Sequence, residues 1–208
     1  MRFLIKICGI THEQGAAAAL DAGANALGFN FYPRSPRYVT PERAAEIIKT
    51  TRGDYLRVGV FVNAGSGELR QTAERVPLDV LQLHGDQSAS LPSPYRLWKS
   101  ADPSQPPTDS ASRFEAYLLD TPSKEFGGSG VTFPWQWAVQ FPHRFLLAGG
   151  LDADNVAEAI AIARPWGVDA CSRLESCPGR KDAQRVREFV RAAQTAAHQL
   201  LSSEFASL

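Results

Sequence analysis

Short apolar segments alternate along the chain with longer segments of helical pattern. The first apolar segment runs from Phe3 to Cys8 and ends at Gly9, and its two isoleucines favour an extended strand. Further apolar segments predict strands over residues 26–31, 56–62, 78–83, 95–99, 115–120, 144–148 and 167–171. The pattern therefore predicts eight short, mostly apolar strands, which is typical of a buried parallel sheet.

Most of the intervals between these strands predict helices. The expected helices cover residues 12–22, 41–50, 66–75, 134–140, 153–163 and 183–201, with a short helical piece after residues 84–86. Thr40, Asp152 and Asp182 precede three of these segments and are expected to cap them. The final residues, 202–208, are expected to fray.

Two intervals lack a helical pattern. Residues 101–113 contain Pro103, Pro106 and Pro107, so we expect a loop in place of the helix that would follow the fifth strand. Residues 124–130 are expected to form a Gly-rich loop. A flexible linker between two domains is the alternative for residues 101–113, but the strand–helix alternation resumes unchanged after them.

The repeated strand–helix unit predicts the fold class. Eight units in 208 residues give about 26 residues per unit, which suits an α/β fold with a parallel sheet and crossover helices. The count of eight favours a single-domain (β/α)8 TIM barrel spanning residues 1–208. An open doubly wound sheet is the alternative, but it usually has a Gly-rich turn after its first strand, where this chain has only Gly9.

Composition narrows the classes of function. Lys+Arg and Asp+Glu number 22 each, so neither nucleic acid nor an anionic membrane is an expected partner. No apolar run approaches the ~18 residues of a membrane-spanning helix, and no signal-peptide pattern precedes the first strand. The 3 cysteines and 4 histidines have no metal-ligand spacing, so we expect no metal site and a reducing, cytoplasmic location.

Functional groups gather where the predicted strands end. In a barrel of this kind the active site lies at the C-terminal ends of the strands. These ends carry Cys8, Asn30, Tyr32, Asn63, Gln82, His84, Lys99, Asp120, Gly149, Gly150, Ser172 and Arg173. The strand bodies before them are mostly apolar, and that contrast favours a functional site at this end of the barrel.

Lys6 and Cys8 share one face of the first strand, because side chains alternate along a strand. A buried thiol is by itself more often a packed core residue, and only the other strand ends favour a functional Cys8. Lys6 requires a buried partner for its charge. Barrel closure brings the eighth strand beside the first, so we predict an inward-facing ion pair of Lys6 and Asp169 below Cys8.

Three further features suit a binding site, each with a plainer alternative. Asp120 follows a buried strand and no helix begins after it, so a general acid of raised pKa is a better interpretation than a helix cap. Gly149–Gly150 and Ser172–Arg173 follow the last two strands and suit phosphate binding, with a tight turn as the alternative. The arginines of loop 32–38 suit a carboxylate, and a solvated loop is the alternative.

Taken together, the strand-end motifs resemble the phosphoribosylanthranilate isomerase family of tryptophan biosynthesis over nearly the whole chain. The matching segments are residues 6–11, 28–38, 58–63, 82–85, 118–120 with 127–133, 147–151 with 155–156, and positions 168, 169, 172, 175, 176 and 178–182. Seven motifs in the right order are far more specific than any one of them.

The resemblance implies an Amadori rearrangement without a cofactor. It would convert N-(5-phosphoribosyl)anthranilate to 1-(2-carboxyphenylamino)-1-deoxyribulose 5-phosphate. By position, Cys8 matches the family's general base, Asp120 its general acid and Arg37 the arginine that binds the anthranilate carboxylate. Substrate-binding roles are implied for Arg37, Gln82, His84, Gly149, Gly150, Ser172 and Arg173, and supporting roles for Lys6 and Asp169.

Two positions depart from the family pattern. Many members have Gly where this chain has Arg173, and its side chain either blocks a close approach of the phosphate or adds a cationic contact, which we favour. Pro134 stands before Trp135 where the family usually has Asp, which affects one polar contact. A free thiol is only a few per cent ionised at neutral pH, so Cys8 is expected to need activation. The charge of Lys6 is the candidate for this activation, and neutralisation of that charge by Asp169 is the alternative.

Other functions remain open on the sequence. A related barrel isomerase of the histidine pathway runs the same rearrangement, but has Asp where this chain has Cys8, and a bifunctional enzyme is a variant of that alternative. A non-catalytic barrel that binds a sugar phosphate would need neither Cys8 nor Asp120. In each case the expected partner is a small phosphorylated molecule, and the chain is expected to be a monomer or a homodimer.

Overall fold

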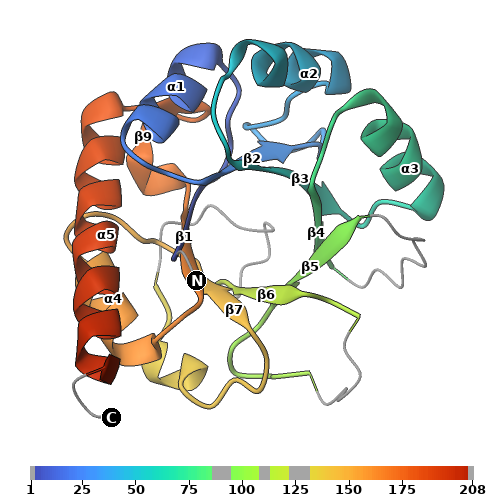
Figure 1. Cartoon of the computed structure of the whole chain (residues 1–208). Helices are drawn as coiled ribbons and strands as arrows, with labels where there is room; N and C mark the ends of the chain where they lie inside the picture. The colour runs from blue at the N-terminus through green and yellow to red at the C-terminus, as the bar shows by residue number, and fades with distance from the viewer. Residues whose placement is uncertain (1–2, 86–94, 108–112, 122–131, 206–208) are drawn as a thin grey trace.

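The computed structural model describes residues 3–85, 95–107, 113–121 and 132–205, and its centre is a closed ring of eight parallel strands (Figure 1). The strands are β1 (Leu4–Ile7), β2 (Ala26–Asn30), β3 (Leu56–Val62), β4 (Val80–His84), β5 (Arg96–Ala101), β6 (Ala116–Leu119), β7 (Phe145–Leu147) and β8 (Gly167–Ala170). The ring closes because β1 pairs with β2 on one side and with β8 on the other. The predicted barrel is confirmed, and the open-sheet alternative is wrong.

The described helices lie on the outer side of the ring, beside β1 to β4, β7 and β8 (Figure 1). They are α1 (Glu13–Asp21), α2 (Pro41–Thr50), α3 (Ser66–Arg75), α4 (Val156–Ala163) and α5 (Ala183–Phe205), with 3-10 turns η1 (Trp135–Ala138) and η2 (Ser172–Leu174). Thr40 caps α2 through its hydroxyl, which accepts a hydrogen bond from the N–H of Arg43 at 3.2 Å. Asp182 precedes α5 and accepts hydrogen bonds from the N–H groups of Gln184 and Arg185.

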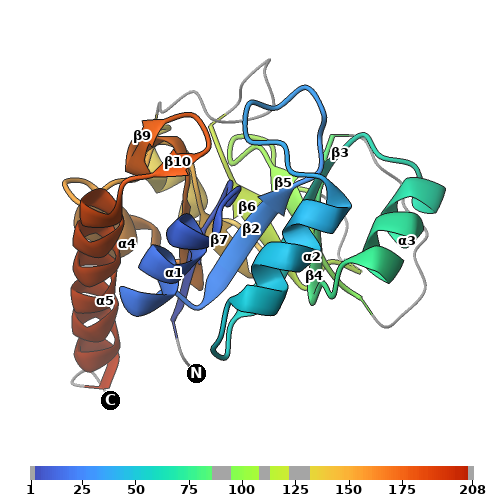
Figure 2. The same ribbon diagram turned by 90° about the horizontal axis from the view of Figure 1, so that it is seen from above.

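A small antiparallel hairpin follows the last barrel strand. Its strands are β9 (Glu175–Cys177) and β10 (Arg180–Lys181). In Figure 2 the chain enters β1 from the lower edge, and this hairpin lies toward the upper edge together with the loop after β2. The hairpin therefore adds side chains to the same end of the barrel at which the parallel strands finish.

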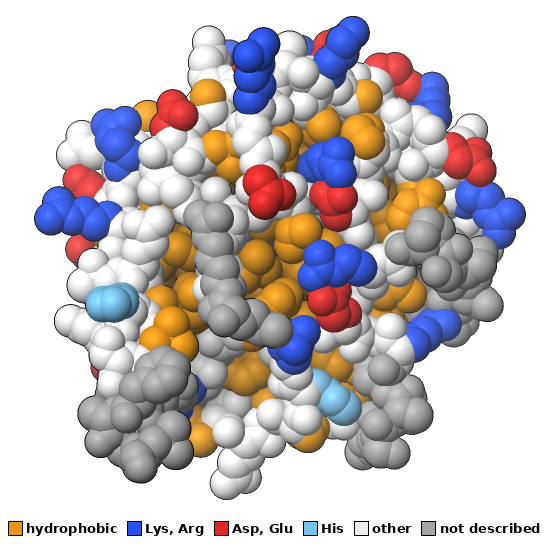
Figure 3. Space-filling model, viewed as in Figure 1, with side chains coloured by type: hydrophobic (Ala, Val, Ile, Leu, Met, Phe, Trp, Pro, Cys, Tyr) orange, Lys and Arg blue, Asp and Glu red, His pale blue; other side chains and the backbone are white. Residues whose placement is uncertain are grey.

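Two apolar layers hold the barrel together, one inside the ring and one between the ring and its helices. The inner layer contains Leu4, Ala26, Val58, Val80, Trp98, Ala116, Leu118, Leu146 and Ala148, all buried. The outer layer packs the opposite faces of the same strands against α1 to α5. Figure 3 shows the N-terminal end of the barrel, where hydrophobic side chains occupy much of the middle among scattered charged ones. Burial of both strand faces explains why the strands lack a polar alternation.

The predicted helix boundaries were wrong at three places. The helix α4 begins at Val156 instead of 153, because Asp152 Oδ1 accepts hydrogen bonds from the N–H groups of Asp154 and Asn155 and forms a turn first. The helix α5 continues to Phe205 instead of ending near residue 201, and residues 206–208 of the expected frayed end lie outside the described part of the chain. Residues 134–140 contain only the short η1 turn.

Some loop predictions lie partly or wholly outside the described residues. A turn lies at residues 103–104, and the Asp102 carboxylate accepts a hydrogen bond from the N–H of Ser104 at 2.8 Å. Residues 108–112, the expected helical piece after residues 84–86 and the expected Gly-rich loop at 124–130 lie outside the described part of the chain.

Candidate active site

The inner face of the barrel changes from apolar to polar along the strands. On β1, Leu4 belongs to the inner apolar layer, and Lys6 and Cys8 follow it at alternate positions. On β4, Val80 is followed in the same way by Gln82 and His84. Because alternate residues share one face of a strand, these polar groups point into the ring at its C-terminal end. The polar site therefore lies at the C-terminal end of the ring, next to the inner apolar layer.

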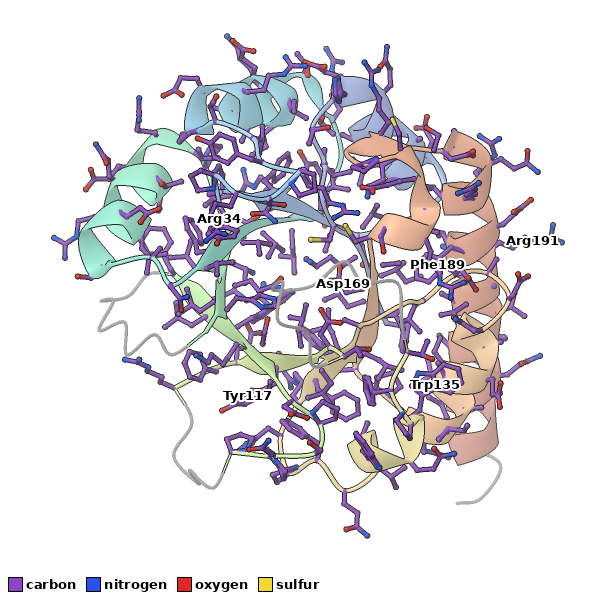
Figure 4. The ribbon with its side chains drawn as sticks, turned by 180° about the vertical axis from the view of Figure 1, so that it is seen from behind. Arg34, Tyr117, Trp135, Asp169, Phe189 and Arg191 are labelled. Carbon is purple, nitrogen blue, oxygen red and sulfur yellow. The ribbon has the colours of Figure 1, made fainter. Side chains whose placement is uncertain are left out.

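Lys6 and Asp169 form an ion pair inside the ring. Lys6 Nζ lies 2.8 Å from Asp169 Oδ1, and the two residues are direct partners in the pairing of β1 with β8. Figure 4 shows Asp169 within the ring, in a view from the side opposite to that of Figure 1. Burial alone would lower the pKa of Lys6, but the Asp169 carboxylate raises it, so Lys6 stays charged. The structure thus contains the predicted pair.

Cys8 has a second thiol beside it. The N–H of Cys8 donates to the carbonyl of Ala170 at 2.9 Å, which continues the β1–β8 ladder and brings Cys8 next to Cys171. The pKa of Cys8 is well above its usual value, because interaction with the Cys171 thiol and burial raise it more than Lys6 lowers it. The expected activation of Cys8 by Lys6 is therefore not the dominant effect in the structure.

Cys171 shows the opposite shift. Its pKa is lowered to about 6, chiefly by the Cys8 thiol and against the effect of burial, with further lowering by Lys181 and Arg37. Lys181 Nζ lies 3.8 Å from the Cys171 sulfur. The two thiols therefore act as a pair that carries one negative charge at neutral pH.

Two glycines make room for these sulfur atoms. A Cβ atom at Gly28 on β2 would lie 2.8 Å from the Cys8 sulfur. A Cβ atom at Gly9, where φ is +73°, would lie 2.9 Å from the Cys171 sulfur and 2.8 Å from Cδ of Arg37. Both positions require glycine, because real Cβ atoms do not approach other atoms so closely.

Asp120 follows β6 on the inner face. Burial, and then the charge of Asp169, raise its pKa to about 6, against the opposing effects of the Thr121 N–H and of Lys6. The N–H of Thr121 donates to Asp120 Oδ1 at 2.8 Å, which fixes the carboxyl group at the strand end. A carboxyl group of this pKa keeps part of its population protonated near neutral pH, as a general acid requires.

Arg37 is held by a carboxylate that the sequence did not single out. Arg37 Nε donates to both oxygens of Glu175, at 3.0 and 3.1 Å, and Nη2 donates to Oε2 at 2.8 Å. Lys181 Nζ donates to Glu175 Oε1 at 2.8 Å and to the carbonyl of Cys171 at 3.1 Å. Among the described residues no hydrogen bond is made by Nη1 of Arg37.

The expected phosphate-binding residues lie after β7 and β8. Gly149 and Gly150 both have positive φ, at 84° and 61°, and a Cβ atom at Gly149 would lie 3.0 Å from Asp120 Oδ1. Ser172 opens the η2 turn after Cys171. Arg173 Nη1 pairs with Asp152 Oδ2 at 2.8 Å, so part of its charge is already balanced by a neighbouring carboxylate.

Gln82 and His84 line the inner face on β4. Gln82 is 2% exposed, and its Oε1 has no hydrogen-bond partner among the described residues. The pKa of His84 is lowered to about 4, first by burial and then by the charges of Lys6 and Lys99, so its ring is neutral at pH 7. Both side chains are therefore suited to hydrogen bonding with a neutral polar group.

Comparison with known proteins identifies the family. The family model described as N-(5'phosphoribosyl)anthranilate (PRA) isomerase matches residues 5–192. The N-(5'-phosphoribosyl)anthranilate isomerase of Solibacter usitatus (strain Ellin6076) is 51% identical over 199 residues, which cover 93% of this chain and 98% of that protein. The chain belongs to the N-(5'-phosphoribosyl)anthranilate isomerase family.

Solved structures of this family share the fold. Phosphoribosyl anthranilate isomerase from Thermotoga maritima gives a TM-score of 0.82 at 34% identity, covering 93% of this chain and 100% of that one. A second solved structure, of phosphoribosyl anthranilate isomerase in complex with reduced 1-(o-carboxyphenylamino)-1-deoxyribulose 5-phosphate, gives a TM-score of 0.76 at 30% identity and covers 93% of this chain and 100% of that one. As a member of this family, the chain is an isomerase of tryptophan biosynthesis.

Some strand-end residues of this phosphoribosylanthranilate isomerase family member form hydrogen bonds that hold the loops around the site. Asn30 Oδ1 accepts a hydrogen bond from the N–H of Tyr32 and holds the loop after β2. Asn63 bonds through its N–H to the carbonyl of His84, with φ at 50°. Lys99 Nζ donates to the carbonyl of Gly85. These four residues support the loops around the site.

The sequence also missed site residues of this family member. The strand β5 extends beyond Lys99 to Ala101, which places Ser100 on the inner face in register with Leu118, and its hydroxyl has no hydrogen-bond partner among the described residues. Cys171 and Glu175 were not given roles either. The sequence offered two signals, namely the alternation of these residues with Asp169 and the presence of a lysine at position 181. Neither signal indicates which residue of a distant strand Cys171 or Glu175 contacts.

No helix in the described part of the chain is long and apolar enough to cross a membrane. The described residues also contain no cluster of three or more His, Cys, Asp or Glu side chains arranged to hold a metal ion.

Proposed function

We propose that this protein converts N-(5-phosphoribosyl)anthranilate to 1-(2-carboxyphenylamino)-1-deoxyribulose 5-phosphate, with Asp120 as general acid and Cys8 as general base. The observation that carries the proposal is their common location. Asp120 and Cys8 follow β6 and β1, on the inner face, at the C-terminal end of one barrel. An acid and a base on separate strands of one ring can reach a sugar ring from different sides.

The first step requires a proton donor at the ribose ring oxygen. The protonated carboxyl of Asp120 donates its proton to that oxygen, the bond from C1 to the ring oxygen breaks, and an open-chain Schiff base forms. The pKa of about 6 at Asp120, which burial raises, supports this role because a carboxyl of ordinary pKa would be almost wholly ionised at pH 7.

The second step requires a base at C2 of the sugar. The Cys8 thiolate removes the C2 proton, and the resulting enolamine rearranges to the ketone. Because the pair of Cys8 and Cys171 carries one negative charge, moving the Cys8 proton to the Cys171 thiolate leaves the charge on Cys8. The nearby Lys6 favours that charge.

The remaining residues are assigned to substrate binding. Gly149 and Gly150 allow the phosphate to approach backbone N–H groups closely, and Ser172 at the start of η2 is assigned to the same phosphate through its hydroxyl. Arg37 retains Nη1 for the anthranilate carboxylate while Glu175 holds its other nitrogens. Gln82 and His84 are assigned to the polar groups of the sugar, because the Oε1 atom of Gln82 is buried and lacks a partner in the described part of the chain.

The reaction is tested by the loss of phosphoribosylanthranilate fluorescence, with the substrate formed in situ. We expect rapid loss with the wild-type protein and a decrease in rate of ~10²–10⁴ in both Cys8→Ala and Asp120→Asn. Cys177→Ser serves as the matched control, because this third cysteine is exposed. The control should keep the wild-type rate.

Two results would contradict the proposal. Full activity in both Cys8→Ala and Asp120→Asn would remove the assigned roles. No turnover by the folded wild-type protein would contradict the substrate assignment, and the histidine-pathway aminoaldose ribonucleotide would then be assayed, followed by equilibrium binding of a sugar phosphate.

A further inference from the structure

Cys8 and Cys171 occupy neighbouring positions on adjacent strands. The β1–β8 ladder pairs Lys6 with Asp169 and Ile7 with Ala170, and the hydrogen bond from the Cys8 N–H to the Ala170 carbonyl continues it by one residue. Both cysteines alternate with the inward-facing ion pair, so both side chains lie on the inner face. The two sulfur atoms therefore face the same part of the barrel mouth.

This placement suits a disulfide bond. Adjacent strands lie about 4.8 Å apart, and Cα atoms joined by a disulfide are separated by about 4.4–6.8 Å, so the cross-link needs no large backbone movement. Both cysteines are partly exposed, which gives a small oxidant access to them. Gly9 and Gly28 lack the Cβ atoms that would crowd the two sulfurs.

The charges around the pair favour reaction of one sulfur with an oxidant. The groups that face Cys171 are Lys181 on β10, Arg37 from the loop after β2, Glu175 on β9 and Cys8 itself, while Lys6 and Asp169 lie beside Cys8. The three cations are only partly balanced by Glu175 and by Asp169, whose pKa burial raises to about 7. The pKa of Cys171 is lowered to about 6, chiefly by the Cys8 thiol and then by Lys181 and Arg37, and the pKa of Cys8 is raised.

We propose that Cys171 and Cys8 form a peroxide-sensitive dithiol, in which Cys171 is the oxidised residue and Cys8 the resolving one. A low-pKa, accessible thiolate next to a second thiol is the usual arrangement of such sites. The Cys171 thiolate attacks one oxygen of hydrogen peroxide, the O–O bond breaks, and sulfenic acid and hydroxide form. The Cys8 thiol then attacks the Cys171 sulfur, a disulfide forms and water leaves. The two sulfurs lose two electrons, and the peroxide gains them.

The cross-link has a consequence for catalysis. A Cys8 sulfur bound to Cys171 has no thiolate and cannot accept a proton from the substrate. Oxidation should therefore abolish isomerase activity until a reductant restores both thiols. This consequence rests on the proposed role of Cys8, whereas the cross-link itself is independent of it.

The test uses the full chain treated with hydrogen peroxide, followed by intact-mass and peptide mass spectrometry. We expect the wild-type protein to lose the mass of two hydrogens and to yield one linked pair of peptides containing Cys8 and Cys171. Cys171→Ser should not form the link. Under conditions that inactivate the wild type, this variant should keep the activity that it had before the peroxide treatment. Cys177→Ser should behave as the wild type, and dithiothreitol should reverse the mass change and the inactivation.

Two outcomes would overturn the proposal. One is the addition of oxygen to Cys8 or Cys171 with no linked peptide, which would show that the second thiol does not resolve the sulfenic acid. The other is an unchanged pair under peroxide that oxidises the exposed Cys177 completely. A linked peptide without loss of activity would support the dithiol and contradict only the role of Cys8 as the base.

Discussion

Lys6 Nζ lies 2.8 Å from Asp169 Oδ1, with the lysine wholly buried inside the barrel and directly below Cys8. Lys6 has no access to bulk water and Asp169 has little, so each charge depends on the other. The pair also joins the first and last strands of the ring, which are 163 residues apart in the sequence. Removing the ion pair should therefore lower the stability of the fold more directly than it lowers the rate of the reaction.

Replacing Lys6 by Met should lower the free energy of unfolding by ~3–5 kcal/mol, because it leaves the buried Asp169 carboxylate without a partner. Urea denaturation measures the change. Glu46→Gln is the control, because the exposed ion pair with Arg43 at 3.1 Å should contribute less than ~1 kcal/mol. The double variant Lys6→Met with Asp169→Leu should recover much of the loss. Equal losses in Lys6→Met and Glu46→Gln would refute the role given to the buried pair.

Replacing Gly28 by Ala should lower kcat by about 10²-fold, because the new methyl group would meet the Cys8 sulfur at 2.8 Å and move it. Gly67→Ala is the matched control, since a Cβ atom there meets nothing within 4 Å. The control should keep kcat and gain ~0.5–1 kcal/mol of unfolding free energy, because Gly67 lies in α3. A normal kcat in Gly28→Ala would show that Cys8 tolerates displacement or is not the base.

Replacing Arg37 by Lys should raise KM by ~10–100-fold with a smaller effect on kcat, because Lys keeps the charge but loses the planar fork that Glu175 holds. Arg34→Lys in the same loop is the control, since Arg34 is exposed. Steady-state kinetics separates the two constants. If Arg34→Lys raised KM and Arg37→Lys did not, the carboxylate site would be assigned to the wrong arginine.

The rate should fall with rising pH as Asp120 loses its proton. A general acid is active only when it is protonated. Above the pKa of about 6, the protonated fraction of Asp120, and kcat/KM with it, should therefore decrease about tenfold per pH unit. In Asp120→Asn this descending limb should disappear from the pH profile, while the overall rate is lower. A descending limb of the same position and slope in the variant would assign it to another group.

The sequence alone predicted the architecture because local patterns encode it. Eight apolar segments with helical intervals specify strands buried on both faces, and the alternation of Lys6 with Cys8 specifies which side chains share a face. The motif positions of Asp120 and Gly149 were equally visible, since each directly follows an apolar strand. The sequence pattern predicted the ends of helices and strands least well. Asp152 forms a turn where a helix was expected to begin, and β5 continues past Lys99 to include Ser100.

Only the tertiary structure decided which of these residues meet. Cys171 lies beside Cys8 because closure of the ring sets the register of β1 against β8. Glu175 reaches Arg37 across 138 residues of sequence because the β9–β10 hairpin lies at the same end of the barrel as the loop after β2. Periodicity determines the face on which a side chain lies, whereas its partner depends on hydrogen bonds between strands far apart in the chain. The apparent pKa values of Cys8, Cys171 and Asp120 follow from those contacts and from burial, so the sequence could name the groups but could not determine their charge.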